Sequence, residues 1–135
     1  MGSPDSSVNM LNIAMTSVSV KDPIAAFEFY TQKLGFIEKV YLPERQVAIV
    51  ASPSDPDGTT ILLEPRGGYG SDIYFNGVYG ANLPVIVFGT DDIHSECERL
   101  KAAGVKFIQD PTESDWGTTA VFDDTCGNFI QIHQP

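Results

Sequence analysis

Residues 58–65 (GTTILLEP) and 127–134 (GNFIQIHQ) are two copies of one pattern that lie 69 positions apart. In each copy, a glycine suited to a tight turn leads into an alternating run that is typical of a β-strand. The upstream segments VSVKD (18–22) and FGTDD (88–92) also match, because each one precedes a helical pattern. Such a long-range repeat indicates two versions of one supersecondary unit. We therefore predict two tandem modules, each with a strand, a helix and three further strands.

The first module has clear start and stop signals for its helix. Residues 11–20 alternate as a strand, and Asp22 is an expected N-cap that is followed by Pro23 at the first helical position. Gly35 is expected to end this helix in a left-handed conformation. The apolar stripe of the helix comprises Ala26, Phe27, Tyr30 and Leu34. The other strands of the module are expected at residues 36–42, 45–51 and 59–64.

The second module repeats this order after a linker at residues 66–82. Its expected strands are 83–89, 105–109, 118–122 and 128–133, and its helix spans 92–103 with Ile93, Cys97 and Leu100 facing inward. We expect the linker to be a loop that packs on a ligand pocket or a second subunit, because it is rich in aromatic residues (Tyr69, Tyr74, Phe75 and Tyr79). The division is thus a flexible lead (1–9) and one domain (10–135) that contains modules 10–65 and 83–134.

Composition excludes several classes of function. The chain has 135 residues, with 18 Asp and Glu against 8 Lys and Arg, so it lacks the basic clusters that bind nucleic acid. No apolar run is long enough to span a membrane, and two cysteines without a disulfide pattern favour the reducing cytoplasm. An acidic surface is compatible with cationic small molecules, and it also simply keeps a protein soluble.

The motifs Val20-Lys21-Asp22, Phe29-Tyr30 and Leu34-Gly35-Phe36, together with residues 124–128 before the last strand, resemble the vicinal oxygen chelate family. This family includes glyoxalase I, bleomycin-resistance proteins and extradiol dioxygenases. The resemblance covers about residues 10–134. It implies an α+β, glyoxalase-like fold in which two βαβββ modules curl their mixed sheets into a cup, and it implies a homodimer.

The resemblance also locates the positions that hold a metal ion in the family's metalloenzymes. They lie seven residues before the Asp that starts each helix and four residues after each turn glycine. Here these positions hold Met15, Val85, Leu62 and Gln131. A thioether, two hydrocarbons and one amide do not form a site for a divalent ion. We therefore expect neither a metal nor another cofactor. These four residues are expected to line an apolar ligand pocket, and they would equally suit a filled core.

Three further residues each have two open interpretations. Glu64 and His133 lie two residues beyond Leu62 and Gln131, on the same predicted inner face, and could form a displaced metal site or an acid–base pair. They could equally be partly solvated residues at the rim. Trp116 could stack on a ligand or pack in the core.

Three functions fit these residues. The first is a metal-independent protein that binds a small molecule, such as a cationic drug, in the manner of bleomycin-resistance proteins. The second is a glyoxalase-like lyase or isomerase that uses Glu64 and His133 with or without a metal. The third is an interaction module without a ligand. The sequence does not decide whether the protein is an enzyme.

Overall fold

The computed structural model describes residues 10–67 and 70–135; the expected lead at 1–9 and Tyr69 of the linker lie outside this range. The described chain contains two modules with the predicted order of elements. The first comprises β1 (Met15–Val20), α2 (Pro23–Glu28), the π-helical turn η1 (Phe29–Lys33), β2 (Ile37–Leu42), the 3₁₀ turn η2 (Pro43–Arg45), β3 (Val47–Ala51) and β4 (Thr60–Pro65). The second comprises β5 (Pro84–Gly89), α4 (Ile93–Ala102), β6 (Phe107–Ser114), β7 (Gly117–Asp123) and β8 (Phe129–Gln134), and α3 (Ser71–Gly80) connects the two.

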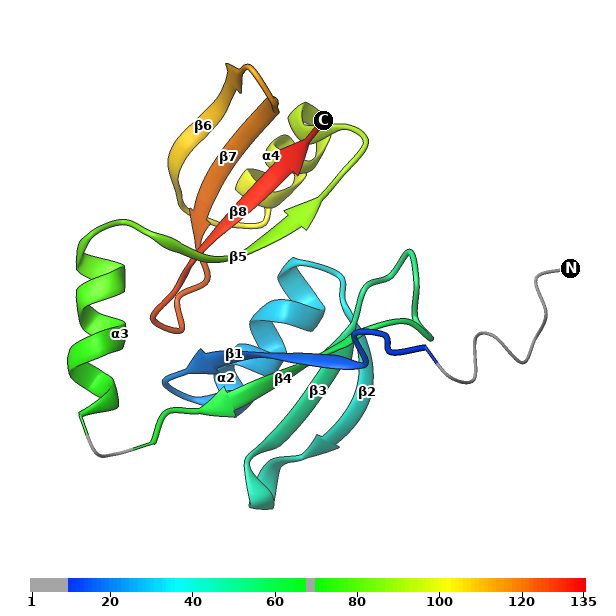
Figure 1. Ribbon diagram of the computed structural model, residues 1–135, viewed down its shortest axis with the longest axis vertical. Coiled ribbons are helices and arrows are strands. Elements are labelled where there is room, and N and C mark those ends of the chain that lie inside the picture. The colour runs from blue at the N-terminus through cyan, green and yellow to red at the C-terminus, as the bar shows by residue number, and fades with distance from the viewer. Residues whose placement is uncertain (1–9, 68–69) are drawn as a thin grey trace, which may run out of the picture.

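Each module forms its own four-stranded mixed sheet (Figure 1). The strand orders are β1-β4-β3-β2 and β5-β8-β7-β6, and the first strand of each module pairs in parallel with the last. The remaining pairs are antiparallel. The α+β prediction of two βαβββ modules is therefore confirmed. None of the helices within residues 10–67 and 70–135 has the length and apolar character of a membrane span.

The outer strands β2 and β6 are irregular. The pairing of β2 with β3 shifts in register between Glu38 and Val40. The pairing of β6 with β7 shifts twice, between Phe107 and Gln109 and again before Thr112. An extra residue at such a point bends the strand and interrupts the hydrogen-bond ladder. These two strands, which form one edge of each sheet, are thus less regular than the inner pairs β3-β4 and β7-β8.

Local signals in the sequence start and end both helices as expected. The Asp22 carboxylate accepts a hydrogen bond from Ile24 N at 3.0 Å, and Asp92 accepts one from Ser95 N at 3.1 Å. Gly35 and Gly104 follow the helices with φ of 82° and 91°, values that residues with a Cβ rarely adopt. The N-caps and the glycine that ends the first helix are therefore confirmed.

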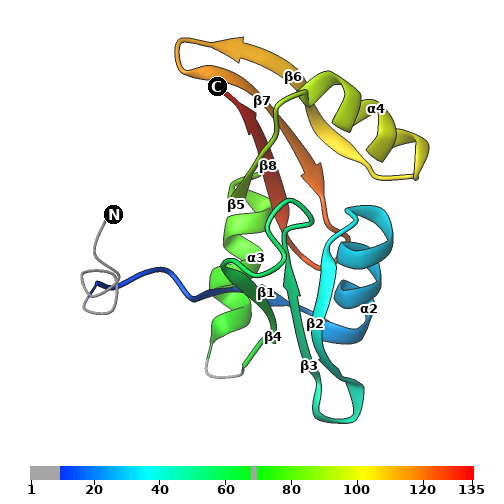
Figure 2. The ribbon, with the colours of Figure 1, turned by 90° about the vertical axis from the view of Figure 1, so that its right-hand side faces the viewer.

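The two modules share one hydrophobic core. Alternation along β1 buries Val18 and Val20 against the helices and leaves Met15 and Ser17 on the opposite face. A single cluster of buried side chains contains residues from both modules, including Tyr30 and Phe122. Figure 2 shows α2 and α4 on the same side of the molecule. The sheet faces turned away from these helices, which we call the open faces, have no helix of their own module to cover them.

The linker differs from its prediction. Residues 71–80 form α3, whereas we expected a loop. Its glycines and its lack of buried residues obscured the helical pattern. Aromatic contacts nevertheless hold the helix in place: Tyr79 stacks on Phe129 with ring centroids 4.4 Å apart and donates a hydrogen bond to Asp123 at 2.6 Å. The linker thus packs on the second module of its own chain, whereas we expected a ligand pocket or a second subunit.

A buried polar network joins the modules. The Tyr30 hydroxyl of the first module donates to Asp124 Oδ2 of the second at 2.8 Å, across 94 residues of sequence. Asp124 Oδ1 accepts from the backbone N–H groups of Cys126 and Asn128 at 2.7 and 3.0 Å. The Asn128 amide donates to Asp124 and to Ser19 O at 3.1 and 2.8 Å. Asp124 thus organises its own turn and binds that turn to the first module.

Burial shifts the ionisation of both members of the central pair. It raises the pKa of Tyr30, and the adjacent Asp124 carboxylate raises this pKa further. Burial also raises the pKa of Asp124, against hydrogen bonds that lower it. A buried carboxylate that has lost hydration depends on its hydrogen-bond donors.

We expect Tyr30→Phe to destabilise the protein by about 1–2 kcal/mol, because one carboxylate oxygen loses a buried donor. Urea unfolding followed by circular dichroism measures this change. Tyr74→Phe is the matched control, since the Tyr74 side chain is 66% exposed, and it should change the free energy of unfolding by less than about 0.5 kcal/mol. Equal stability of the two variants would show that the network is energetically unimportant.

Candidate functional site

A pocket of about 510 Å³ lies where the two modules meet α3. We call it the α3 cavity. Ser17 and Ser19 of β1, Glu64 at the end of β4 and Val85 of β5 lie in its wall, and α3 contributes Tyr74, Phe75 and Val78. Its volume falls within the range of about 300–1,000 Å³ that is usual for small-molecule sites. Both modules and α3 contribute to its wall, so the position of α3 determines the shape of the cavity.

The α3 cavity combines aromatic surface with one negative charge. Glu64 is the single charged side chain among the residues that line it. The Arg66 guanidinium stacks on the Phe75 ring at 4.7 Å and donates to Gly127 O at 2.9 Å, so its charge is engaged beside the wall rather than in it. A carboxylate beside aromatic rings suits a ligand with an apolar body and a positively charged group.

The structure separates the residues that we predicted to line one pocket. Val85 lines the α3 cavity, but Met15, Leu62 and Gln131 do not. Leu62 is opposite Ser17 and Ile49 in the first sheet, and Gln131 is opposite Val87 and Val121 in the second. These side chains lie along the open faces, where alternation places them, and Met15 is 49% exposed. The cavity instead forms at one end of these faces, beside α3.

Glu64 and His133 also have different surroundings. Glu64 lines the α3 cavity, whereas the His133 ring stacks on Trp116 with centroids 5.0 Å apart, and its Nε2 lies 3.0 Å from Trp116 O. No contact between Glu64 and His133 occurs in the part of the chain that the structure describes. The two occupy matching positions in the repeat, but β4 and β8 belong to different sheets. The described arrangement does not bring them together as an acid–base pair.

Trp116 lies in the turn between β6 and β7, and 67% of its side chain is exposed. It is therefore not a core residue, although core packing was one of its two predicted roles. A ligand at the open face of the second sheet could reach it, but Trp116 lies outside the wall of the α3 cavity.

The positions that hold metal in related enzymes do not fit a metal here. Met15, Leu62 and Val85 offer no ligand atom for a hard or borderline divalent ion, and Gln131 offers one amide oxygen. Within residues 10–67 and 70–135, no group of three or more His, Cys, Asp or Glu side chains is placed to hold an ion.

Sequence reasoning missed part of this site. It singled out Tyr74 as an aromatic of the linker but did not assign Ser17, Ser19 or Val78 to a pocket. The signal was present in the repeat, because Ser17 and Ser19 share the open face of β1 with Met15. The missing information was the position of α3, which depends on contacts of Tyr79 with a turn more than 40 residues away.

Comparison with known proteins identifies the family. Residues 12–132 match the sequence profile of the Glyoxalase/Bleomycin resistance protein/Dioxygenase superfamily. The chain belongs to this superfamily. It is 46% identical over 127 residues to YurT of Bacillus subtilis (strain 168), covering 92% of this chain and 99% of that protein.

Members of the superfamily with other descriptions are also similar. A probable lactoylglutathione lyase of Vibrio cholerae is 30% identical, covering 90% of this chain and 89% of that protein. The crystal structure of TnmS3, an antibiotic binding protein from Streptomyces sp. CB03234, superposes with a TM-score of 0.74. The two are 27% identical, and the match covers 94% of this chain and 98% of TnmS3. The chain is therefore similar both to a probable enzyme and to an antibiotic binding protein.

We predict that neither thiol acts as a nucleophile. Cys97 and Cys126 are each 3% exposed, and burial raises the pKa of both, that of Cys126 to about 12. Thiolate is the reactive form, so both groups should react slowly with a thiol reagent in the folded protein and rapidly in denaturant. Spectrophotometric titration with Ellman's reagent measures this difference. Rapid reaction of one thiol per chain in native buffer would contradict it.

Proposed function

We propose that this superfamily member binds a small organic cation in the α3 cavity. The observation that carries the proposal is the lining of the cavity, in which Glu64 is the single charged side chain beside Tyr74 and Phe75. An apolar or aromatic body would pack on the rings, and its positive group would face the carboxylate. The formal net charge of −10 supports the same class of ligand, because it favours the approach of cations.

The comparisons support binding as the function. TnmS3, which shares the fold across almost its whole length, is described as an antibiotic binding protein. The proposed ligand of the present chain is accordingly a drug-like cation. Catalysis by Glu64 and His133 as a pair is not supported, because Glu64 lines the α3 cavity whereas His133 stacks on Trp116.

We propose further that binding does not need a metal ion. Contacts in the α3 cavity are aromatic, aliphatic, hydroxyl and carboxylate, and they suffice to hold a cation without an intervening ion. The replacement of ligand residues by Met15, Leu62 and Val85 supports this view, since the usual metal positions then contribute apolar surface.

We expect Glu64→Gln to weaken binding of a hydrophobic cation, with tetraphenylphosphonium as the probe. The loss should be roughly two- to fivefold, the scale of one partly exposed ion pair, and should shrink as salt is added. Isothermal titration calorimetry with and without EDTA measures the affinity and its independence of metal.

Two controls make this test specific. Glu44→Gln removes an exposed carboxylate from the turn between β2 and β3 and should leave the affinity unchanged. Triphenylphosphine oxide, an uncharged relative of the probe, should bind the unsubstituted protein more weakly than the cation does. Equal affinity of the two compounds, or loss of binding in EDTA, would contradict the proposal.

We also propose that the protein is a homodimer that covers its open faces with a second copy. These faces carry exposed apolar side chains on β1, β2 and β5, including Met15 (49%), Val40 (38%) and Val87 (52%). Exposed apolar surface of this kind commonly marks an interface. The α3 cavity lies at one end of the same faces, so a second copy would partly enclose its ligand.

We also propose that the protein is cytoplasmic. Both cysteines are free thiols rather than a disulfide, as expected in a reducing compartment.

We expect Met15→Glu to shift the protein from dimer to monomer, because the charge would be buried without a partner at the proposed interface. Analytical ultracentrifugation at micromolar concentration measures the mass. Ile24→Glu is the matched control: Ile24 is 37% exposed but belongs to α2, away from the open faces. A monomeric unsubstituted protein, or dissociation by the control alone, would refute this interface.

A further inference from the structure

A second cavity lies at the other junction between the modules, on the side of α4. We call it the seam cavity. Its volume is about 280 Å³. Apolar side chains from both modules contribute to its wall: Leu34, Phe36, Phe88, Leu100, Phe122 and Ile132. The turn at residues 52–54 and the end of β5 complete it. It shares no lining residue with the α3 cavity.

The repeat explains why this cavity exists. In the first module, Tyr30 reaches Asp124, and the turn before β8 packs against the end of β1. The position that corresponds to Tyr30, eight residues after the N-cap, is Leu100 in the second module. Leucine has no hydroxyl with which to draw in the corresponding turn before β4. The network that fills one junction is therefore missing from the other.

The backbone differs in the same way. At the end of β1, Ser19 O accepts from the Asn128 amide at 2.8 Å, and Lys21 N donates to Cys126 O at 3.1 Å. Ser19 and Lys21 lie three residues and one residue before the N-cap Asp22. The groups at the same distances before the N-cap Asp92 are Gly89 O and Asp91 N. Among the residues that the structure describes, neither has a hydrogen bond to the segment 52–59, which contains the turn before β4.

Strand geometry directs these groups toward the cavity. β5 is an edge strand, and Thr90 N donates to His133 O of the neighbouring strand at 3.0 Å. Successive residues of a strand direct their backbone groups to opposite sides, so Gly89 O points to the free edge. Gly89 itself lines the seam cavity. An acceptor is thus available in the wall of the seam cavity. The Asp91 N–H donor lies two residues further on, in an adjoining hollow that shares Gly89 and Thr90 with this cavity.

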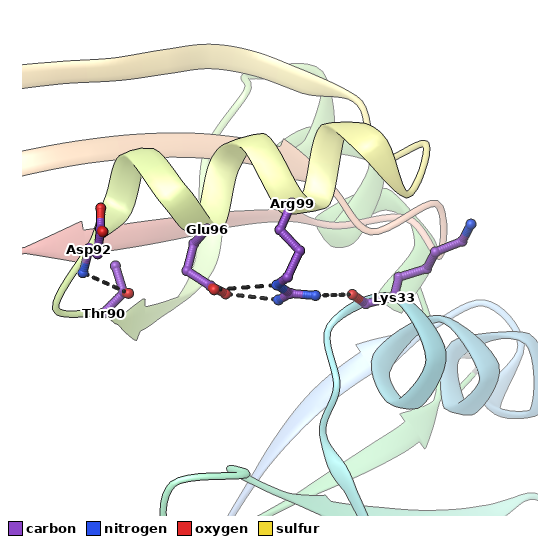
Figure 3. A network of polar contacts seen from close by, with 5 residues as sticks. All are labelled: Lys33, Thr90, Asp92, Glu96 and Arg99. Carbon is purple, nitrogen blue, oxygen red and sulfur yellow. Dashed lines mark hydrogen bonds and ion pairs between the residues drawn. The ribbon is translucent and has the colours of Figure 1, made fainter.

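Charge at the seam cavity is already balanced. Figure 3 shows Arg99 between Glu96 and Lys33, with its guanidinium facing the first module. Arg99 makes two hydrogen bonds to the Glu96 carboxylate, at 2.8 and 3.3 Å, and a third to Lys33 O at 3.1 Å. The charges of the ion pair offset each other, and three of the five guanidinium N–H donors are in use. A charged ligand would gain little here, whereas an uncharged one would keep the pair intact.

We infer that the seam cavity is a second binding site, for a small uncharged molecule that carries a carboxamide on an apolar body. Its amide N–H would donate to Gly89 O, its carbonyl would accept from Asp91 N–H, and its body would pack against Phe88 and Leu100. The ligand would thus supply the contacts that Asn128 and its turn supply in the first module. The cavity is near the lower end of ligand-site volumes, which limits the body to about one ring.

Benzamide is the probe for this site. Titration of the ¹⁵N-labelled full chain should produce saturable shifts in the amide signals of Gly89, Thr90 and Asp91. Benzoate and benzylamine, which place a charge where the amide would be, should bind at least fivefold more weakly. Shifts that do not saturate, that centre on Glu64 and Tyr74, or that benzoate reproduces at equal affinity would overturn the inference.

Two substitutions test the location. Ile132→Phe fills the cavity and should weaken benzamide binding at least fivefold. Gly89→Leu is the second variant, because a Cβ at Gly89 would approach no atom closer than His133 O at 4.0 Å, so the fold should tolerate it. Ser17→Trp narrows the α3 cavity instead and should leave benzamide binding unchanged. Unchanged affinity in both seam variants, with each shown to be folded by its amide spectrum, would refute the site.

Discussion

The hydrogen bond from Tyr30 to Asp124 is the contact on which the arrangement of the modules depends. Asp124 is fully buried, and it is held by donors from its own turn and from the first module. A buried carboxylate is costly unless such donors are present, so the two modules are held in an orientation that keeps them in place. Apolar packing supplies most of the driving force, while this network selects one geometry among many that would bury similar area.

The same contact is the main difference between the two junctions of an otherwise repeated structure. At the junction where Tyr30 bonds to Asp124, the turn before β8 closes over the end of β1. Where Leu100 replaces the tyrosine, the turn before β4 remains apart and a cavity is left. The junction on that side depends instead on reciprocal bonds: Lys33 donates to Ala103 O at 2.5 Å, and Arg99 donates to Lys33 O at 3.1 Å. The junction at Asp124 is therefore held by a buried hydrogen-bond network, whereas the junction at Lys33 is held by hydrogen bonds nearer the surface.

Much of the fold could be read from the sequence because its signals are local. The N-caps Asp22 and Asp92, the glycine at position 35 and the alternation of β1 each depend on residues within a few positions. The repeat then supplied the order of the modules. The cup-like pairing of sheets required the family resemblance, since no local pattern states how two modules meet.

The site was harder to predict because it depends on long-range contacts. The sequence placed Glu64 and His133 at matching positions, but equivalence in a repeat does not imply proximity. The α3 cavity depends on the hydrogen bond from Tyr79 to Asp123, which lie 44 positions apart. Asp124 binds its own turn through local contacts, but its bond to Tyr30 spans 94 positions and left no pattern to detect.

The register shifts in β2 and β6 bear on how copies of this chain can associate. A regular outer strand would invite another chain to extend the sheet by backbone pairing, and such growth has no natural end. The shifts at Glu38 and Gln109 interrupt that template, and Pro111 in β6 removes one N–H donor from it. Extension of the sheets along β2 and β6 is thereby disfavoured, which agrees with the proposal that copies associate face to face.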